Sequence, residues 1–291
     1  MTKKRSFTKK IVPKGAKRLW AQCLLSALCS VAAYNDTQAW QELYALPKCT
    51  LRSQQRGGGS RNFGESETKR LCQGWLEGQR MSLWLQAKDS KPKRQPVSAD
   101  DVTDAMRNRV RELTGLNQFK KACAAVIQAP PVYVTSQVIH DMESKRPRAR
   151  AGLRWDSLRP VHAAAAVVVD SEGVCNAIKS FPKGSGCGPY GLRPQHLPDA
   201  LVPGFEDEVV RQLRAVVNIW VRGEATEEVR SFLSGASLTA LPKEDGDPRP
   251  IAVGEVLRRL GGKCCANIVK DDMRQILEPW QVGVCRHAWR M

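Results

Sequence analysis

The segment Phe181–Leu197 most constrains how this chain can fold, because its composition excludes both a regular helix and a regular strand. It runs F-P-K-G-S-G-C-G-P-Y-G-L-R-P-Q-H-L and places four glycines and three prolines around two basic residues, Lys183 and Arg193. Irregular backbone of this kind occurs where a chain closely approaches a phosphate group or another chain segment. We therefore expect Lys183 and Arg193 to contact nucleic acid, with close packing between chain segments as the alternative.

A second segment, Leu241–Ile251, predicts a short antiparallel β-arm. Residues 237–241 can run extended, residues 244–247 supply turn-forming side chains, and residues 249–253 lead back out. This arrangement places Lys243 and Arg249 on either side of one turn, where both can point at a common anion. The alternative is a surface turn that carries ordinary solvated charges.

At these two segments the chain resembles the reverse transcriptase of a non-LTR retrotransposon. The pattern of that family runs F-P-x-G-S-x-x-G-x-D-G-L-R-P-Q-H-L and, after a helical stretch, L-P-K-x-D-G-x-x-R-P-I-A-V-G-E-V-L-R-R-L. Both motifs occur here in this order and spacing, and the resemblance covers about Val174–Val284. One departure is Tyr190, which stands where the family usually carries an acidic residue, so that the contacts of the local loop are expected to differ.

The resemblance implies part of an RNA-directed DNA polymerase, the fingers-like portion before the catalytic palm. The expected fold is α+β and predominantly α, with a small antiparallel β-element, preceded by basic helical and partly disordered segments. In such a protein Lys243 and Arg249 would face the triphosphate of an incoming nucleotide, the guanidinium as a fork and the ammonium as a point charge.

Templated nucleotide addition needs two metal ions held by carboxylates. In the family these carboxylates come from an Asp beyond the region where this chain stops and from a Tyr-x-Asp-Asp hairpin further on. The acidic pairs Asp100–Asp101 and Asp271–Asp272 lie in predicted helices, outside such a hairpin. We therefore expect no catalytic residues, no cofactor in this fragment, and Mg²⁺ only in a complete polymerase.

The net charge of +17 is concentrated in the first half of the chain. Residues 1–150 hold 28 Lys and Arg against 12 Asp and Glu, whereas residues 151–291 hold 18 against 17. An excess of this size favours a nucleic-acid partner, an RNA template or DNA, although a solvated surface also fits. Two other hypotheses stay open: a non-catalytic nucleic-acid-binding protein that acts through its basic N-terminal half, and a fragment with no selected function.

The ten cysteines contain no C-x-x-C pair and the four histidines are scattered, so the sequence predicts no metal finger. Because the chain opens without a signal peptide, we expect reduced thiols and an intracellular location, in the nucleus or cytoplasm. The apolar run Leu19–Tyr34 is too short and too polar to span a bilayer, and no membrane partner is expected. The oligomeric state is left open.

Composition, Gly- and Pro-containing linkers and the resemblance to reverse transcriptases together divide the chain into five segments. In order, these are a basic flexible arm, a helical basic region with a Gly/Arg loop, a helical lead-in with a basic linker, a partial reverse transcriptase domain and a divergent tail: 1–18, 19–95, 96–150, 163–284 and 285–291. The tail C-R-H-A-W-R-M departs from the family, which favours a truncated or frameshifted copy.

Several helices follow from apolar spacing. The strongest is Phe205–Arg222, with one apolar face and three acidic residues in its first turn. A helical hairpin is expected at the start, its second helix ending at Pro47, and Glu65–Ala87 has helical character. A helix that begins at 255–260 is expected to be interrupted at Gly261–Gly262.

Overall fold

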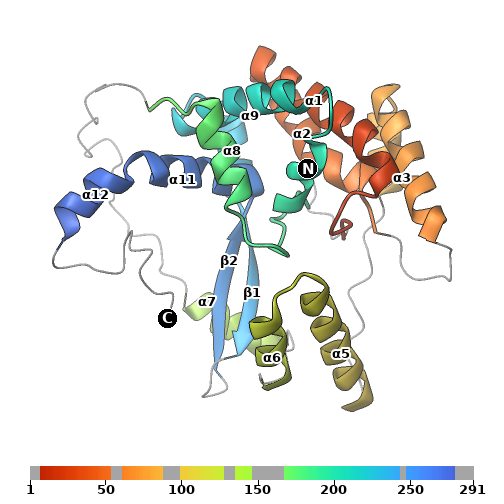
Figure 1. Cartoon of the computed structure of the whole chain (residues 1–291), viewed down its shortest axis with the longest axis vertical. Helices are drawn as coiled ribbons and strands as arrows, with labels where there is room; N and C mark the ends of the chain where they lie inside the picture. The colour runs from red at the N-terminus through yellow and green to blue at the C-terminus, as the bar shows by residue number, and fades with distance from the viewer. Residues whose placement is uncertain are drawn as a thin grey trace.

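The computed structural model describes residues 7–53, 61–87, 99–127, 135–145, 167–242 and 247–278. These ranges form a mostly helical body and one two-stranded antiparallel sheet, which extends away from the body (Figure 1). The prediction of a predominantly helical α+β fold is confirmed at this level. No helix in the described ranges is long and apolar enough to cross a membrane.

The N-terminal helical hairpin consists of α1 (Lys17–Tyr34) and α2 (Thr37–Thr50), which pack against each other. The carboxylate of Asp36 caps α2 by accepting a hydrogen bond from the backbone amide of Ala39 at 2.7 Å. The predicted stop at Pro47 is wrong, because α2 continues through this residue for one more turn. Burial of Leu46 and Cys49 in the core compensates for the hydrogen bond that the proline cannot donate.

The predicted helical stretch Glu65–Ala87 is divided in two by a turn at Gly78, whose φ is +85°. The remaining elements follow in chain order: α3 (Arg61–Leu76), α4 (Arg80–Gln86), α5 (Ala99–Gly115), α6 (Phe119–Ile127), α7 (Ser136–Ser144), α8 (Ser171–Lys179), α9 (Glu206–Val221), α10 (Glu227–Leu233), β1 (Ala236–Pro242), β2 (Pro248–Gly254), α11 (Val256–Ile268) and α12 (Lys270–Leu277). Three short 3₁₀ turns are Lys14–Ala16, Pro194–His196 and Pro198–Ala200.

One hydrophobic core joins the two ends of the chain. Helix α1 packs along α9, and α8 and α11 pack on α9 from the other direction (Figure 1). The shared cluster includes Trp20 and Leu24 of α1 together with Leu213 and Val217 of α9, all of them buried. The predicted segments 19–95 and 163–284 therefore contribute to the same core, and the boundaries between them stay predictions.

Residues 7–18 differ from the expected flexible arm. Thr8 forms a β-bridge with Arg52, and Val12 and Ala16 are buried. The backbone amide of Val12 donates a hydrogen bond to the carboxylate of Asp199 at 2.9 Å. Thr8, Val12 and Ala16 follow one another at four-residue intervals. These small or apolar side chains can be buried together although the segment carries many charges.

Helix α11 runs without a break through Gly261, where an interruption was expected. A Cβ atom at Gly261 would lie 2.5 Å from the ring of Trp220, so the glycine allows α11 and α9 to pack closely. The β-arm pairs Ala236 with Gly254 at its base and Pro242 with Pro248 at its outer end. Residues 243–246, which include most of the predicted turn, lie outside the described residues.

Candidate nucleic-acid interface

The two motif segments pack directly against each other. The backbone amide of Tyr190 donates a hydrogen bond to Oε1 of Glu255, the residue that precedes α11. The guanidinium of Arg259 donates to the carbonyl of Gly186 at 2.8 Å. A Cβ atom at Gly188 would lie 2.7 Å from the Cα of Glu255, so this position accepts only a glycine without rearrangement. The loop 181–197 and α11 thus form one structural unit.

Tyr190, the departure from the family pattern, is a packing residue. Its side chain is 8% exposed and stacks on the ring of Tyr44 in α2, with ring centroids 4.7 Å apart and an interplanar angle of 29°. The next residue, Gly191, accepts a hydrogen bond on its carbonyl from the hydroxyl of Thr8 at 2.6 Å. A stacked aromatic pair therefore holds the loop against the N-terminal helices, where a charged side chain would be desolvated.

His196 fixes the other end of the loop. Its Nε2 lies 2.8 Å from the carbonyl of Lys9, and its Nδ1 accepts a hydrogen bond from the backbone amide of Arg193 at 3.1 Å. Burial lowers the pKa of His196 to about 4, so the ring is neutral at neutral pH. The indole of Trp20 donates to the carbonyl of His196 at 2.9 Å. Because both ring nitrogens are engaged by backbone groups, His196 has a positioning role.

Glu255 lies beneath the loop with no exposed surface. Burial raises its pKa to about 7, against the opposing effect of hydrogen bonds from the amides of Tyr190 and Val256 and of the charges of Lys48 and Arg259. Neither Oε2 of Glu255 nor the hydroxyl of Tyr44 has a hydrogen-bond partner within the described part of the chain. These groups are covered by the loop and cannot reach a substrate in solution.

Four basic residues lie on this unit or, in the case of Lys179, at the end of α8 just before it. We call them the cationic face: Lys179, Lys183, Arg259 and Lys263. Lys179 and Lys183 are exposed, while Arg259 and Lys263 lie over the ring of Phe181 at 5.3 and 5.1 Å from its centroid. Arg259 and Lys263 bond to carbonyl oxygens, and no described carboxylate forms an ion pair with any of the four. Lys179, Lys183 and Lys263 thus have no carboxylate partner among the described residues, whereas the charge of Arg259 is partly offset by the buried carboxyl of Glu255.

The cations of the N-terminal helices contrast with this face, because many of them pair with carboxylates. The pairs are Lys10–Glu112, Lys17–Asp199, Arg52–Glu67, Lys69–Glu65, Arg70–Glu67 and Arg80–Glu42. Lys9 is also engaged, by the carbonyl of Gly64 and the hydroxyl of Thr68. Six cations of the described N-terminal segments are thus paired with carboxylates.

The predicted binding residues occupy separate places. Lys183 belongs to the cationic face, whereas Arg193 lies at the far end of the loop, with a buried Nε that has no hydrogen-bond partner among the described residues. Arg249 is exposed near the outer end of β2, opposite Leu241 and roughly 17 Å along the strand from Gly254. Lys243 lies outside the described residues, so the common anion site with Arg249 stays a prediction.

The sequence did contain a signal for two residues that the motif argument missed. Arg259 and Lys263 are separated by four positions, which places them on the same side of a helix. A break of the helix at Gly261 would separate the two residues. Once the helix is continuous, both side chains reach Phe181.

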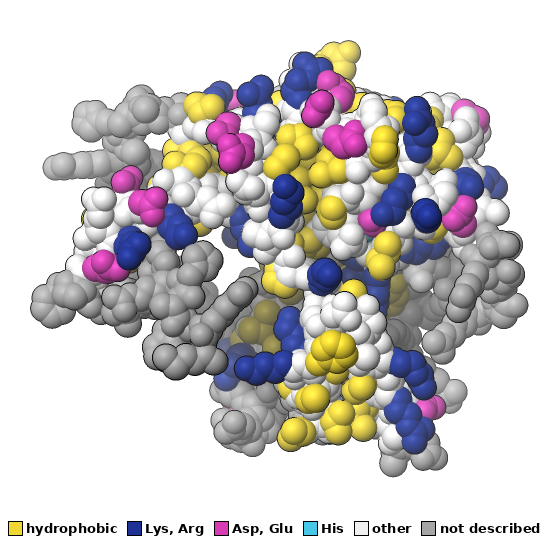
Figure 2. Space-filling view, in the orientation of Figure 1, with side chains coloured by type: hydrophobic (Ala, Val, Ile, Leu, Met, Phe, Trp, Pro, Cys, Tyr) yellow, Lys and Arg dark blue, Asp and Glu magenta, His cyan; other side chains and the backbone are white. Residues whose placement is uncertain are grey.

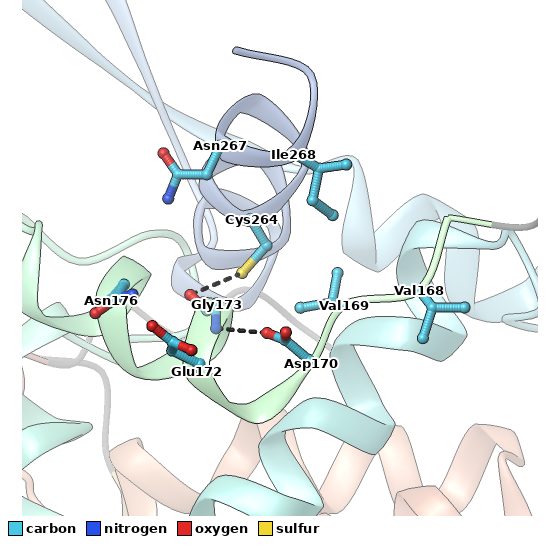
Figure 3. Close-up of a pocket in the computed structure, with 9 residues that line it drawn as sticks. All are labelled: Val168, Val169, Asp170, Glu172, Gly173, Asn176, Cys264, Asn267 and Ile268. Carbon is cyan, nitrogen blue, oxygen red and sulfur yellow. Dashed lines mark hydrogen bonds between the residues drawn. The ribbon is translucent and has the colours of Figure 1, made fainter. Parts of the chain in front are cut away.

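A small pocket of about 250 Å³ lies between the start of α8 and the end of α11 (Figure 3). Asp170 caps α8 by accepting a hydrogen bond from the amide of Gly173 at 2.7 Å, and the thiol of Cys264 donates to the carbonyl of Gly173 at 3.7 Å. Burial raises the pKa of Cys264 to about 11, so it is a protonated thiol at neutral pH. In the described ranges, no three His, Cys, Asp or Glu side chains come together as metal ligands.

Comparison with protein-family models, curated proteins and solved structures finds no match to this chain. The likeness to reverse transcriptases therefore depends on the two sequence motifs.

Proposed function

We propose that this chain binds nucleic acid through the cationic face, as the fingers-like, non-catalytic portion of a non-LTR retrotransposon reverse transcriptase. The observation that carries the proposal is that Lys179, Lys183 and Lys263 have no carboxylate partner among the described residues, and that the carboxyl group near Arg259, that of Glu255, is buried with a pKa raised to about 7. These residues lie on the unit that the two family-like motifs build together. The proposal thus joins the sequence resemblance to a physical reason for attracting a polyanion.

The carbonyl hydrogen bonds matter because they orient the cations without neutralising them. The guanidinium of Arg259 is held by the carbonyl of Gly186 and by the ring of Phe181, so little side-chain entropy is lost when it meets a phosphate. Binding of phosphates then releases condensed counterions, which makes the affinity depend on salt. A cation that is already paired with a carboxylate contributes less to the binding free energy, since binding must first break the existing pair.

Polymerisation is not part of the proposal. The exposed Asp271 and Asp272 begin α12 and are joined by no third ligand among the described residues, so we derive no metal-dependent step. Mg²⁺ would belong to a complete polymerase, and an intracellular location, nuclear or cytoplasmic, accompanies the proposal. The competing hypothesis is binding through the basic N-terminal half, where some described cations, such as Arg80 with Glu42, are already paired with carboxylates.

The test is a binding titration of the full chain with labelled RNA and DNA oligonucleotides at two salt concentrations. The double variant Lys179→Ala, Lys183→Ala removes two exposed cations from the cationic face, and Lys69→Ala, Arg70→Ala is the matched control, because both of its cations are paired with carboxylates. We expect the first to bind about tenfold more weakly, with a salt slope smaller by about one for each phosphate contact that is lost.

The control variant should bind like the wild type. Equal weakening by both variants would show that only total charge matters, and an unchanged affinity of the first would refute the cationic face as the binding site. A primer-extension assay run beside the titration, with Mg²⁺ and nucleotides, is expected to give no product.

A further inference from the structure

The turn between α5 and α6 is anchored to the loop that carries Lys183. The side-chain amide of Gln118 donates a hydrogen bond to the carbonyl of Lys183 at 2.7 Å. The side chain of Leu116 lies 3.1 Å from the position that a Cβ atom of Gly184 would take. Figure 1 shows this turn reaching the loop beside the base of the β-arm. The start of α6 is therefore fixed next to the cationic face.

Phe119 is the first residue of α6 and directly follows Gln118. Its side chain is 58% exposed, and the two residues after it, Lys120 and Lys121, are exposed as well. Figure 2 shows apolar side chains over α5 and α6, with Lys and Arg side chains on either side of them. The other rings near the loop are less accessible, because Tyr44 and Tyr190 are buried and the half-buried ring of Phe181 is covered by Arg259 and Lys263.

We propose that Phe119 is a base-stacking platform and that the partner of the cationic face is therefore a single-stranded nucleic acid. This inference rests on the proposed function. In a duplex the faces of the bases are already stacked, whereas a single strand presents them to an aromatic side chain. Cations that follow the phosphates beside a ring that receives a base are the general arrangement of proteins that bind single strands.

Val126 and Ile127, exposed at the end of α6, are the reason to consider a protein partner for the same helix. An apolar protein surface would use Ile127, which is 86% exposed, at least as much as Phe119. Charge favours the nucleic acid, because Lys120, Lys121 and Lys183 surround the anchored end of the helix. Ile127 provides the matched control that separates the two partners.

The experiment measures the affinity of the full chain for a single-stranded oligonucleotide and for a duplex of similar total charge. The variants are Phe119→Ala, Phe119→Tyr and Ile127→Ala. We expect Phe119→Ala to weaken single-strand binding about tenfold and to leave duplex binding unchanged, because stacking on one base is lost. Phe119→Tyr keeps the ring and should bind like the wild type, as should Ile127→Ala.

A second readout uses an oligonucleotide with 5-iodouracil, whose photo-crosslink to the wild-type chain should map to Phe119 by mass spectrometry. If Phe119→Ala binds single strands as tightly as the wild type, the stacking platform is refuted while the cationic face stands. If Ile127→Ala weakens binding as much as Phe119→Ala, a general apolar contact replaces stacking. If the wild type binds neither oligonucleotide, the proposed function fails and this inference fails with it.

Discussion

The backbone amide of Tyr190 donates a hydrogen bond to the buried carboxyl group of Glu255, which joins the glycine-rich loop to α11 through a titratable group. The bond connects the two motifs on which the sequence interpretation depends. Because the carboxyl is buried, its charge state contributes to the stability of the loop.

The first prediction concerns pH and Glu255. Its pKa is raised from 4.5 to about 7, so the folded state holds the proton more tightly than the unfolded state. Stability from this group is therefore fully present below about pH 4.5 and is lost as pH rises through about 7, by up to about 3 kcal/mol. Glu255→Gln keeps an oxygen for the amide of Tyr190 and removes the ionisation. Urea unfolding should show the variant more stable than the wild type at pH 8 and nearly equal at pH 5.

Glu172→Gln, on the exposed surface of α8, is the control for this measurement and should change the free energy of unfolding neither at pH 5 nor at pH 8. The same stability difference for Glu255→Gln at pH 5 and at pH 8 would contradict the assigned titration.

The second prediction concerns His196, whose pKa is lowered from 6.5 to about 4. The unfolded state binds the proton more readily, so stability falls as pH drops from about 6.5 to 4, by about 3 kcal/mol. His196→Gln should lose this dependence and be less stable at neutral pH, because one of the two backbone hydrogen bonds is lost. Unfolding curves across this range check the slope, with His140→Gln on the exposed side of α7 as the control. If the free energy of unfolding of His196→Gln still fell with pH as in the wild type, another group would be the cause of the acid sensitivity.

The third prediction compares two glycines of one loop. Gly188→Ala would place a methyl group 2.7 Å from the backbone of Glu255, whereas a Cβ atom at Gly186 meets nothing within 4 Å. We expect Gly188→Ala to destabilise the protein by about 1–3 kcal/mol or more, and Gly186→Ala to change it by less than about 1 kcal/mol. Denaturant midpoints of the two variants decide the matter, and equal midpoints would mean that the loop is not packed on α11 as described.

The fourth prediction concerns a fragment of residues 1–150. Trp20, Leu24 and Leu28 of α1 are fully buried in a core shared with α9, which the fragment lacks. Uncovering these side chains leaves an apolar surface and removes much of the burial that offsets chain entropy. The fragment should show no cooperative thermal transition by circular dichroism, unlike the full chain. A sharp transition would show that the N-terminal helices form an independent domain.

Local patterns predicted much of the helical structure. The strong apolar face predicted within Phe205–Arg222 is that of α9. Its buried residues recur at helical spacing, and Gly223 follows the helix with a φ of +71°. The β-arm was likewise visible as two extended runs around turn residues.

Features that depend on distant partners were missed for a physical reason. Pro47 and Gly261 are helix breakers by local propensity, yet each lies in a helix that tertiary packing stabilises. The burial of Val12 depends on a core that is completed by helices much later in the chain. The placement of Arg259 and Lys263 over Phe181 likewise could not be predicted, because a sequence motif gives the residue types and does not say which side chains lie beside them.

Thr8 and Val12 bind the carbonyl of Gly191 and the carboxylate of Asp199, which follow them by 183 and 187 residues. A ribosome adds roughly 5–20 residues per second, so these bonds cannot form until roughly 10–40 seconds after Thr8 and Val12 are themselves added to the chain. During that interval the side of α1 that packs against α9 has no native cover, and chaperones and neighbouring nascent chains can bind it. The yield of this protein in a cell should therefore depend on the rate of translation as well as on the stability of the finished molecule.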